Sequence, residues 1–485
     1  MNTILFLTYF FILIFGINAD NLRFLQPSLP DQNSNQNPNS NSNSNSYDYS
    51  SYKYQSTNQN LDSQTLTSTN SDESVVYITS SSYTISNSNL NKDSGNSSNT
   101  ENSEFYGVNA AVLVQGGELA ITGGTITTKA KGANALCATN NGKVTITGTT
   151  ITSTGSSSAR GLHATYGGSI TATNVGVSST GDSCATLATD RGEGTVSCTN
   201  CNLSTAGAGS PLIYSTGDIT VSGTAGTASG AQMVVVEGKN TATVKGSSKL
   251  YCTGVGNRKN VDKCGIMLYQ SMSGDADSGT STFNCESSNM EILSTSSVYS
   301  SAPMFFITNT DASINLNACS FTYGSGIFLS AGGTSEWGSS GTNGGVVTLT
   351  LNNQQIVGNF VVDENSGLTI VMKGNSSIKG TINTAKTAAK LSITLDSSSS
   401  IELTGNSCYT SITNGDQTGS NLNNNTFTWS KTEEKTISRP TGGSGGQPPS
   451  STPKDEDNDD DDSNKKTSSS NCIRVSLLLI IFILL

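Results

Sequence analysis

The chain has little charge, almost no histidine and no long apolar segment. Only one of its 485 residues is histidine, and Asp, Glu, Lys and Arg together make up 13% of it, about half of their usual share. A single histidine leaves little basis for a zinc site. The net charge is −11, and without a basic stripe to neutralise phosphates nucleic acid is excluded as a partner. The two apolar runs, residues 4–15 and 475–485, are too short for a transmembrane helix.

What the sequence does contain is a repeat of about 25 residues. Glycine turns recur at intervals of 25, 26, 26 and 23 residues, and apolar residues stand two, nine and about twenty positions after each turn. Each short segment alternates apolar residues with Thr or Ser and is rich in β-branched side chains, so the units are strands. Stacked units bury an apolar side that one unit alone leaves exposed. The turns are Gly117, Gly142, Gly168, Gly194 and Gly217, and the first apolar column is Leu119, Val144, Ile170, Val196 and Ile219.

The repeat predicts an all-β fold, a parallel β-helix with about three short strands in each coil, over residues 103–430. This length corresponds to on the order of twelve coils and a rod on the order of 60 Å long. The pattern is interrupted at residues 255–263, 274–279 and 331–344. We expect loops there, and loops are the usual place for binding residues on a rigid scaffold.

Segments of a different character flank the repeat. We expect a signal peptide at residues 1–19 and an Asn/Ser-rich spacer at residues 20–102, in which residues 75–79 and 83–85 are candidate cap strands. Residues 431–464 read as a Gly/Ser/Pro linker and an acidic stalk. Residues 465–485 match a GPI-attachment signal, and a short membrane anchor is the alternative. The candidate attachment residues are Asp462, Ser463 and Ser469.

Ten cysteines and four N-x-[ST] triplets fit the secretory route that the signal peptide indicates. Cys252 and Cys264 flank one interruption of the repeat and are the candidate pair for a disulfide that closes it. The C-x-x-C of Cys198 and Cys201 gives only weak grounds for a redox or zinc site, because neither a helix signal nor a second such motif accompanies it. The candidate glycosylation sites are Asn96, Asn202, Asn375 and Asn424.

Charged residues beside glycines are the candidates for catalysis or metal binding. Alternate residues of a strand share a face, so Asp275 and Asp277 form a candidate metal or acid pair. Arg191 with its acidic neighbours forms a candidate base-and-metal set. We favour the competing interpretation of solvated turns held by salt bridges, since glycine marks each of these segments as a turn. The candidates are Asp190, Arg191 and Glu193, then Glu237 and Lys239, then Asp275 and Asp277.

Two other features have structural explanations. His163 follows Leu162 in an apolar column and has no Ser or Cys partner in its motif, so we expect a structural role. Pairs of the form Thr-x-Thr recur, as at Thr145/Thr147. A flat threonine ladder would suit ice or crystalline glycan, but threonine is also a favoured outward residue of strands.

Five segments of the repeat region carry a family resemblance: residues 158–173 (SARGLHATYGGSITAT), 188–194 (ATDRGEG), 235–240 (VVEGKN), 265–276 (GIMLYQSMSGDA) and 306–312 (FITNTDA). They resemble large adhesin-like proteins of anaerobic microbes, and the resemblance covers residues 106–412. It implies a right-handed parallel β-helix of the pectate-lyase-like type and supplies no catalytic residues. The Asn-rich spacer and GPI-like end are similar to those of surface proteins of unicellular eukaryotes.

The sequence therefore predicts an extracellular β-helical protein, held at the cell surface by a lipid anchor, that serves as an adhesin-like or structural display rod. The expected partners are the membrane, through the anchor, and glycans or other cell-surface proteins; no cofactor is expected. The alternative is a polysaccharide lyase or glycosidase, which requires clustered carboxylates with basic or aromatic residues on one face. That alternative fails if Asp190, Glu193, Asp275 and Asp277 lie far apart or on different faces.

Overall fold

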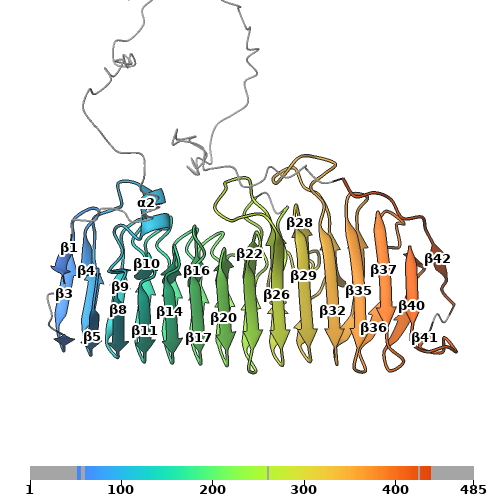
Figure 1. The fold of residues 1–485 in the computed structure, drawn as a ribbon, viewed down its shortest axis with the longest axis horizontal. Coiled ribbons are helices and arrows are strands. Elements are labelled where there is room, and N and C mark those ends of the chain that lie inside the picture. The colour runs from blue at the N-terminus through green and yellow to red at the C-terminus, as the bar shows by residue number, and fades with distance from the viewer. Residues whose placement is uncertain (1–51, 56–59, 259–260, 424–425, 439–485) are drawn as a thin grey trace, which may run out of the picture. The chain divides into compact units, whose positions relative to one another are not determined.

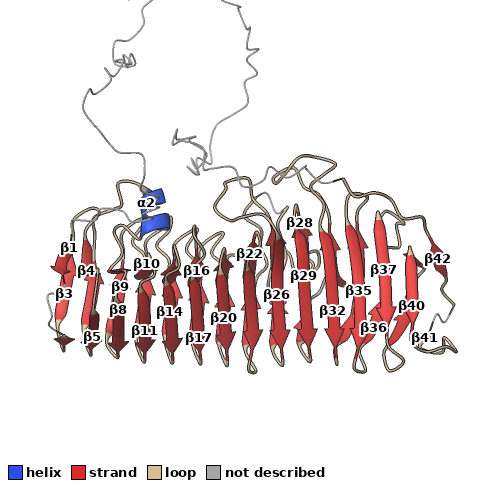
Figure 2. Ribbon diagram, in the orientation of Figure 1, coloured by secondary structure: helices blue, strands red, loops and turns tan. Residues whose placement is uncertain are grey.

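The computed structural model describes residues 52–55, 60–258, 261–423 and 426–438. These residues form a parallel β-helix, a stack of coils made almost entirely of parallel strands with one short helix among them (Figures 1 and 2). Within this part of the chain, no helix is long and apolar enough to span a membrane. The expected signal peptide, the acidic stalk and the GPI signal with Asp462, Ser463 and Ser469 lie outside the described residues.

Three long sheets run along the stack, and a typical coil passes from the first to the second to the third. We call them the front, base and side sheets. The front sheet contains β1 (Tyr52–Gln55), β4 (Ser74–Ile78), β7 (Val112–Gln115), β10 (Leu136–Thr139), β13 (Leu162–Ala164), β16 (Leu187–Thr189), β19 (Ile213–Ser215), β22 (Val234–Glu237), β25 (Ile266–Tyr269), β28 (Phe305–Thr308), β31 (Ile327–Ala331) and β34 (Asn359–Val362).

The base sheet contains β2 (Leu61–Asp62), β5 (Ser82–Ser86), β8 (Glu118–Thr122), β11 (Lys143–Thr147), β14 (Ser169–Thr173), β17 (Thr195–Thr199), β20 (Asp218–Ser222), β23 (Thr241–Lys245), β26 (Thr280–Glu286), β29 (Asp311–Asn317), β32 (Val346–Asn352), β35 (Gly367–Lys373), β37 (Lys390–Leu395) and β40 (Ser411–Asn414). The side sheet contains β3 (Thr65–Ser68), β6 (Asn89–Lys92), β9 (Thr125–Thr128), β12 (Thr150–Ser153), β15 (Gly176–Ser179), β18 (Asn202–Thr205), β21 (Ala225–Ala228), β24 (Lys249–Cys252), β27 (Asn289–Ile292) and β30 (Ser320–Thr322).

The register of these strands confirms the repeat in the sequence. In β11, exposed Lys143 and Thr145 alternate with buried Val144 and Ile146, so every second side chain points into the core. Parallel pairing then stacks equivalent residues of successive coils into continuous apolar columns. The first predicted column is such a stack of buried partners: Leu119, Val144, Ile170, Val196 and Ile219.

The β-helix begins earlier in the chain than residue 103. Strands β2 to β6 pair in register with the following coils, and Val75 and Val76 are fully buried. The candidate cap strands at residues 75–79 and 83–85 are present as β4 and β5, but they belong to full coils, so the predicted spacer at residues 20–102 ends too late. Helix α2 (Thr100–Tyr106) follows; Asn99 caps its first turn and Gly107, with φ of 72°, ends it.

The last coils depart from the three-sheet pattern. The side sheet ends at β30, and a four-stranded sheet continues the stack. Large rings fill the interior at this change, where the ring centroids of Phe305 and Phe328 lie 5.3 Å apart. After the last strand the chain folds back along the stack: Lys435 N donates to Ala389 O at 2.8 Å. The remaining strands are β33 (Gln355–Val357), β36 (Ser377–Gly380), β38 (Ser400–Leu403) and β41 (Leu422–Asn423), and the pair β39 (Ser407–Tyr409) and β42 (Trp429–Lys431).

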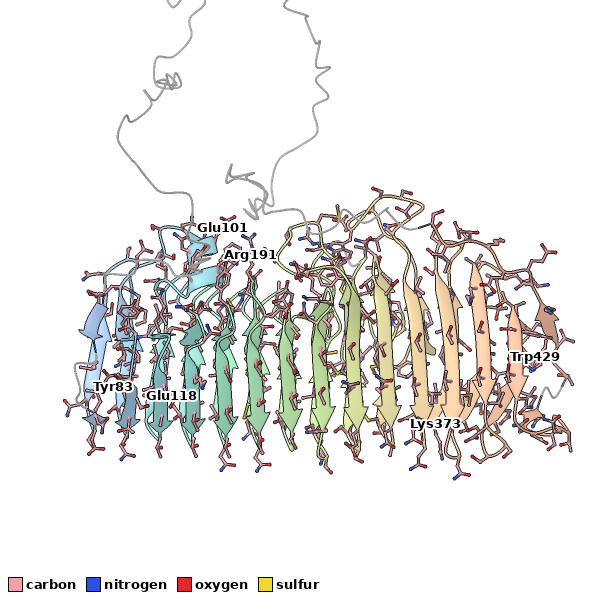
Figure 3. The ribbon with its side chains drawn as sticks, in the orientation of Figure 1. Tyr83, Glu101, Glu118, Arg191, Lys373 and Trp429 are labelled. Carbon is pink, nitrogen blue, oxygen red and sulfur yellow. A yellow bond between two sulfur atoms is a disulfide. The ribbon has the colours of Figure 1, made fainter. Side chains whose placement is uncertain are left out.

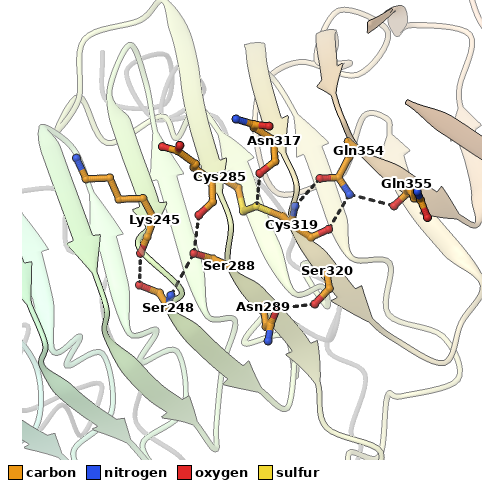
Figure 4. The surroundings of a disulfide bond; sticks show 11 residues. Lys245, Ser248, Cys285, Ser288, Asn289, Asn317, Cys319, Ser320, Gln354 and Gln355 are labelled. Atoms are coloured by element: carbon orange, nitrogen blue, oxygen red, sulfur yellow. Dashed lines mark hydrogen bonds between the residues drawn. A yellow bond between two sulfur atoms is a disulfide. The ribbon is translucent and has the colours of Figure 1, made fainter. Parts of the chain in front are cut away.

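The disulfides differ from the expected pair. Cys198 bonds to Cys201 across a tight turn, and Cys285 of β26 bonds to Cys319 of the next coil (Figure 4). Cys252 and Cys264 are buried and unbonded, which corrects the prediction. The reason is packing: Cys252 lies in the central core, whereas Cys264 belongs to a separate cluster.

Candidate functional site

The outer face of the front sheet carries side chains that point away from the core. One residue of each strand forms this column, and the strands place successive members in register. Helix α2 and its neighbours cover the first members, and Cys264 and Trp337, from the loops before β25 and after β31, cover the last ones; α2 and these loops lie along the same edge of the stack (Figure 1). Between these two covers Tyr214 is partly exposed, whereas Ala188 and Val235 are buried. From β7 to β28 the column consists of Leu113, Cys137, His163, Ala188, Tyr214, Val235, Met267 and Phe306.

Side chains from three coils hold α2 on this face. Asn134 Nδ2 donates to Ser103 O at 2.8 Å, and Thr165 Oγ1 donates to Phe105 O at 2.8 Å. The guanidinium carbon of Arg191 lies 3.8 Å from the centroid of the Phe105 ring, a cation–π contact. Figure 3 shows Arg191 beside the helix, on the loop-bearing edge of the stack. These side-chain contacts fix a helix of seven residues that is too short to be stable alone.

The two loops at the other end are held by their own polar side chains. The Asp262 carboxylate accepts hydrogen bonds from the backbone N–H groups of Asn257 and Arg258, both at 3.2 Å. In the second loop, Asn343 Nδ2 donates to Trp337 O at 2.6 Å. The Arg258 guanidinium lies 5.8 Å from the Trp337 ring centroid and joins the two loops.

Between α2 and these loops lies a cleft of about 220 Å³. Tyr214, Val235 and Met267 of the outward column form its floor, and the two loops form one wall. Tyr214 and Tyr269 contribute aromatic rings, Val235 and Met267 contribute apolar surface, and Arg258 contributes a cation. Polar atoms make up the larger part of the cleft's lining, beside these aromatic and apolar side chains.

A buried polar network lies under and beside the cleft. Arg160 Nη1 pairs with Asp190 Oδ2 at 2.7 Å. The hydroxyl groups of Tyr214 and Tyr269 donate to Glu237 Oε2 at 2.5 and 2.7 Å. Burial raises the pKa of Asp190 to about 7 against the opposing effect of Arg160, and burial also raises the pKa of Glu237. Both carboxyl groups are at most 3% exposed.

The other charged residues singled out in the sequence form an ionic strip at the corner of the front and base sheets. Arg191 Nη2 pairs with Asp275 Oδ1 at 3.0 Å, although 84 positions separate them. Lys239 Nζ pairs with Glu193 Oε1 at 2.6 Å and with Asp277 Oδ2 at 3.0 Å. Salt bridges thus join Arg191, Glu193, Lys239, Asp275 and Asp277, as in the favoured interpretation of these turns, whereas Asp190 and Glu237 are buried beside the strip.

Their pairing limits the chemistry available to these carboxylates. Asp275 and Asp277 bind different cations, which corrects the predicted metal or acid pair: they lie in a loop between β25 and β26, not on a strand. In the described part of the chain, no group of three or more His, Cys, Asp or Glu residues is arranged to hold a metal ion. Asp190 contacts buried Arg160 instead of the strip.

His163 is fully buried between the front sheet and α2. Its Nε2 lies 2.6 Å from Glu104 O and 3.3 Å from Arg160 Nη1. A carbonyl oxygen only accepts, so Nε2 carries the proton, and the approach of Arg160 Nη1, which is also a donor, is a contact and not a hydrogen bond. Burial, then the positive charge of Arg160, lowers the pKa of His163 to about 3. This is the structural role expected from the sequence.

Three of the four candidate glycosylation sites are exposed. Asn96, Asn202 and Asn375 lie on the surface, and Asn424 lies outside the described residues. Thr145 and Thr171 are register partners on the outer face of the base sheet, in an uncharged row of hydroxyl and amide groups.

Sequence reasoning missed the residues that shape the cleft: Arg160, Tyr214, Arg258, Tyr269 and Trp337. Tyr214 had a usable signal, because it stands one position after the apolar column, as do Cys137 and His163. Arg258 and Trp337 had none beyond their place in interruptions of the repeat. Comparisons with protein-family models, curated proteins and solved structures found no match.

Proposed function

We propose that this chain is an extracellular, lipid-anchored surface protein whose β-helix displays a glycan-binding cleft, an adhesive role. The observation that carries the proposal is the cleft itself, where two tyrosine rings, a tryptophan and Arg258, which forms no ion pair with a carboxylate of the described residues, meet on the outer face of the front sheet. Aromatic rings with polar neighbours suit a sugar, which has apolar ring faces and polar edges. The expected signal peptide and anchor support display on the cell surface.

The polysaccharide lyase or glycosidase remains the second candidate, because Asp190, Glu193, Asp275 and Asp277 gather in one region. The pairing of these groups favours binding over catalysis. A catalytic acid or base needs access to the substrate, whereas Asp190 is buried and the other three are held by Arg191 or Lys239. In addition, α2 and the loops block the outer face at both ends of the cleft.

The proposal is tested on the native protein at the cell surface. Intact cells are treated with phosphatidylinositol-specific phospholipase C, and the released protein is applied to a glycan array. Release with selective glycan binding supports a GPI-anchored adhesin. Release without binding to any glycan overturns the binding function and leaves a coat role, and retention on the cells overturns the GPI assignment in favour of a short membrane anchor.

The enzyme alternative has a separate assay. The released protein is incubated with acidic and neutral polysaccharides, and new reducing ends or unsaturated products are measured. Turnover that is lost in Glu193→Gln and Asp277→Asn would establish the enzyme, whereas binding without turnover supports the adhesive role.

A further inference from the structure

We propose that the cleft is specific for the acidic terminal sugar of a glycan, with the guanidinium of Arg258 pairing with the ligand's carboxylate or sulfate. This inference rests on the glycan-binding function proposed above and narrows it to one ligand class. Three observations carry it: the charge of the cleft, its size and its closed ends.

The cation in the cleft is available to a ligand. Two arginines line the cleft, and Arg160 is paired with Asp190 at 2.7 Å and lies 3.9 Å from Glu104. Arg258 is exposed, and no carboxylate within the described residues forms an ion pair with it. Its position over the Trp337 ring fixes the guanidinium through a face contact and leaves its N–H edge able to bind an anion.

The acidic residue that lines the cleft does not cancel this charge. Asp262 is 6% exposed, and its oxygens accept the backbone N–H groups of Asn257 and Arg258. Gln232 Nε2 donates to Asp262 O at 2.7 Å and holds the same turn in place. The carboxylate therefore shapes the loop that presents Arg258, and both of its oxygens are engaged by backbone N–H groups.

The size and ends of the cleft favour a terminal group. Its volume of about 220 Å³ is below the roughly 300–1,000 Å³ of sites for drug-sized ligands, so it admits about one sugar ring. Along the stack the outer face is covered on one side by α2 and on the other by the loop of Trp337. A long polymer parallel to the stack does not fit between these walls, whereas the end of a chain does.

Apolar contact supplies the rest of the recognition. The rings of Tyr214 and Tyr269 are fixed by hydrogen bonds to Glu237, and Tyr269 packs edge-on against Trp337 with ring centroids 5.2 Å apart. Fixed rings bind with little loss of side-chain entropy. The ligand class is therefore a single pyranose ring that carries a negative charge.

The experiment compares matched acidic and neutral probes on the full released protein. Binding of sialyllactose and lactose, and of methyl glucuronide and methyl glucoside, is measured by calorimetry at low and high salt. We expect one acidic probe to bind at least roughly tenfold more tightly than its neutral counterpart, with affinity falling as salt rises. Arg258→Gln should remove this preference, and Arg258→Lys should restore part of it.

The control variant is Lys249→Gln, which removes the same charge from an exposed position on the side sheet and should bind like the wild type. Circular dichroism of each variant checks that the fold is retained. Equal affinity for acidic and neutral probes, or an unchanged preference in Arg258→Gln, overturns the acidic specificity while the glycan-binding function stands. Failure to bind any glycan on the array overturns the glycan-binding function itself.

Discussion

His163 gives a pH prediction that a single substitution isolates. The imidazole is fully buried, faces the backbone oxygen of Glu104 and the guanidinium of Arg160, and has its pKa lowered to about 3. In the unfolded chain its pKa is about 6.5. Between these values the unfolded state binds a proton that the folded state does not, so acidification from pH 6.5 towards pH 3 lowers the stability contributed by this residue.

The expected magnitude follows from the pKa difference. Each pH unit inside the window changes the free energy of unfolding by about 1.4 kcal/mol, so the contribution of His163 falls by roughly 2–3 kcal/mol between pH 6.5 and 4.5. Asp190 opposes this change. Its pKa is raised to about 7, so the folded state holds an extra proton below pH 7 and gains stability over much of the same window. The contribution of Asp190 is common to the wild type and His163→Gln, so it cancels when their free energies of unfolding are subtracted.

The assay is urea unfolding of wild type and His163→Gln at pH 7.5 and pH 4.5. At pH 7.5, the difference in free energy of unfolding between the two proteins measures the altered contact with Glu104. The change in this difference at pH 4.5 measures the effect of the proton that His163 binds in the unfolded state. We expect the variant to gain roughly 2–3 kcal/mol relative to the wild type on acidification. Because the chain has only one histidine, its proton NMR signal can be followed without overlap and should stay unshifted to pH 5. A midpoint near 6.5, or a difference that is independent of pH, would refute the reasoning.

Two further predictions concern the stacking of the coils. A β-carbon at Gly181 would lie 1.8 Å from Gly155 O of the preceding coil, whereas one at Gly176 meets nothing within 4 Å; we expect Gly181→Ala to lose about 1–3 kcal/mol in thermal unfolding and Gly176→Ala to stay within about 0.5 kcal/mol of the wild type. The Cys285–Cys319 disulfide spans 34 positions, so Cys285→Ala should lose about 3–4 kcal/mol, and a reductant should shift the urea midpoint of the wild type more than that of the variant.

The fold could be predicted from the sequence because parallel stacking of coils requires apolar residues to recur at equivalent positions in each coil. Leu119, Val144 and Ile170 occupy equivalent positions in successive coils, and pairing aligns them as expected. In the first coils only the strands that contain Val76 and Tyr83 were expected, as caps; the rest of these coils was not predicted because apolar residues are sparse within Asn/Ser-rich sequence. The Cys252–Cys264 pair was wrong because flanking a loop does not place two side chains on the same side of a sheet.

The site could be predicted only in part. Arg191 and Asp275 were singled out separately, but their contact depends on how four coils stack. A local sequence motif does not predict a contact between residues so far apart in the chain. The cleft depends on Tyr214, Arg258 and Trp337, of which the last two lie in loops without a repeat position. Register predicts which residues share a face, whereas loop conformation decides what covers that face.

The corners of the coils show where this scaffold has been varied. From β8 to β9 and from β11 to β12 the base-to-side corner is two residues long, and it is still two residues between β26 and β27 and between β32 and β33. The long insertions all adjoin front-sheet strands: α2 precedes β7, residues 253–265 precede β25, residues 270–279 follow β25, and residues 332–345 follow β31. A protein that served only as a spacer would have no reason to confine its irregularities to the two edges of one sheet. Two of these insertions contribute Arg258 and Trp337 to the cleft, so their distribution supports the proposal that binding takes place on the front sheet.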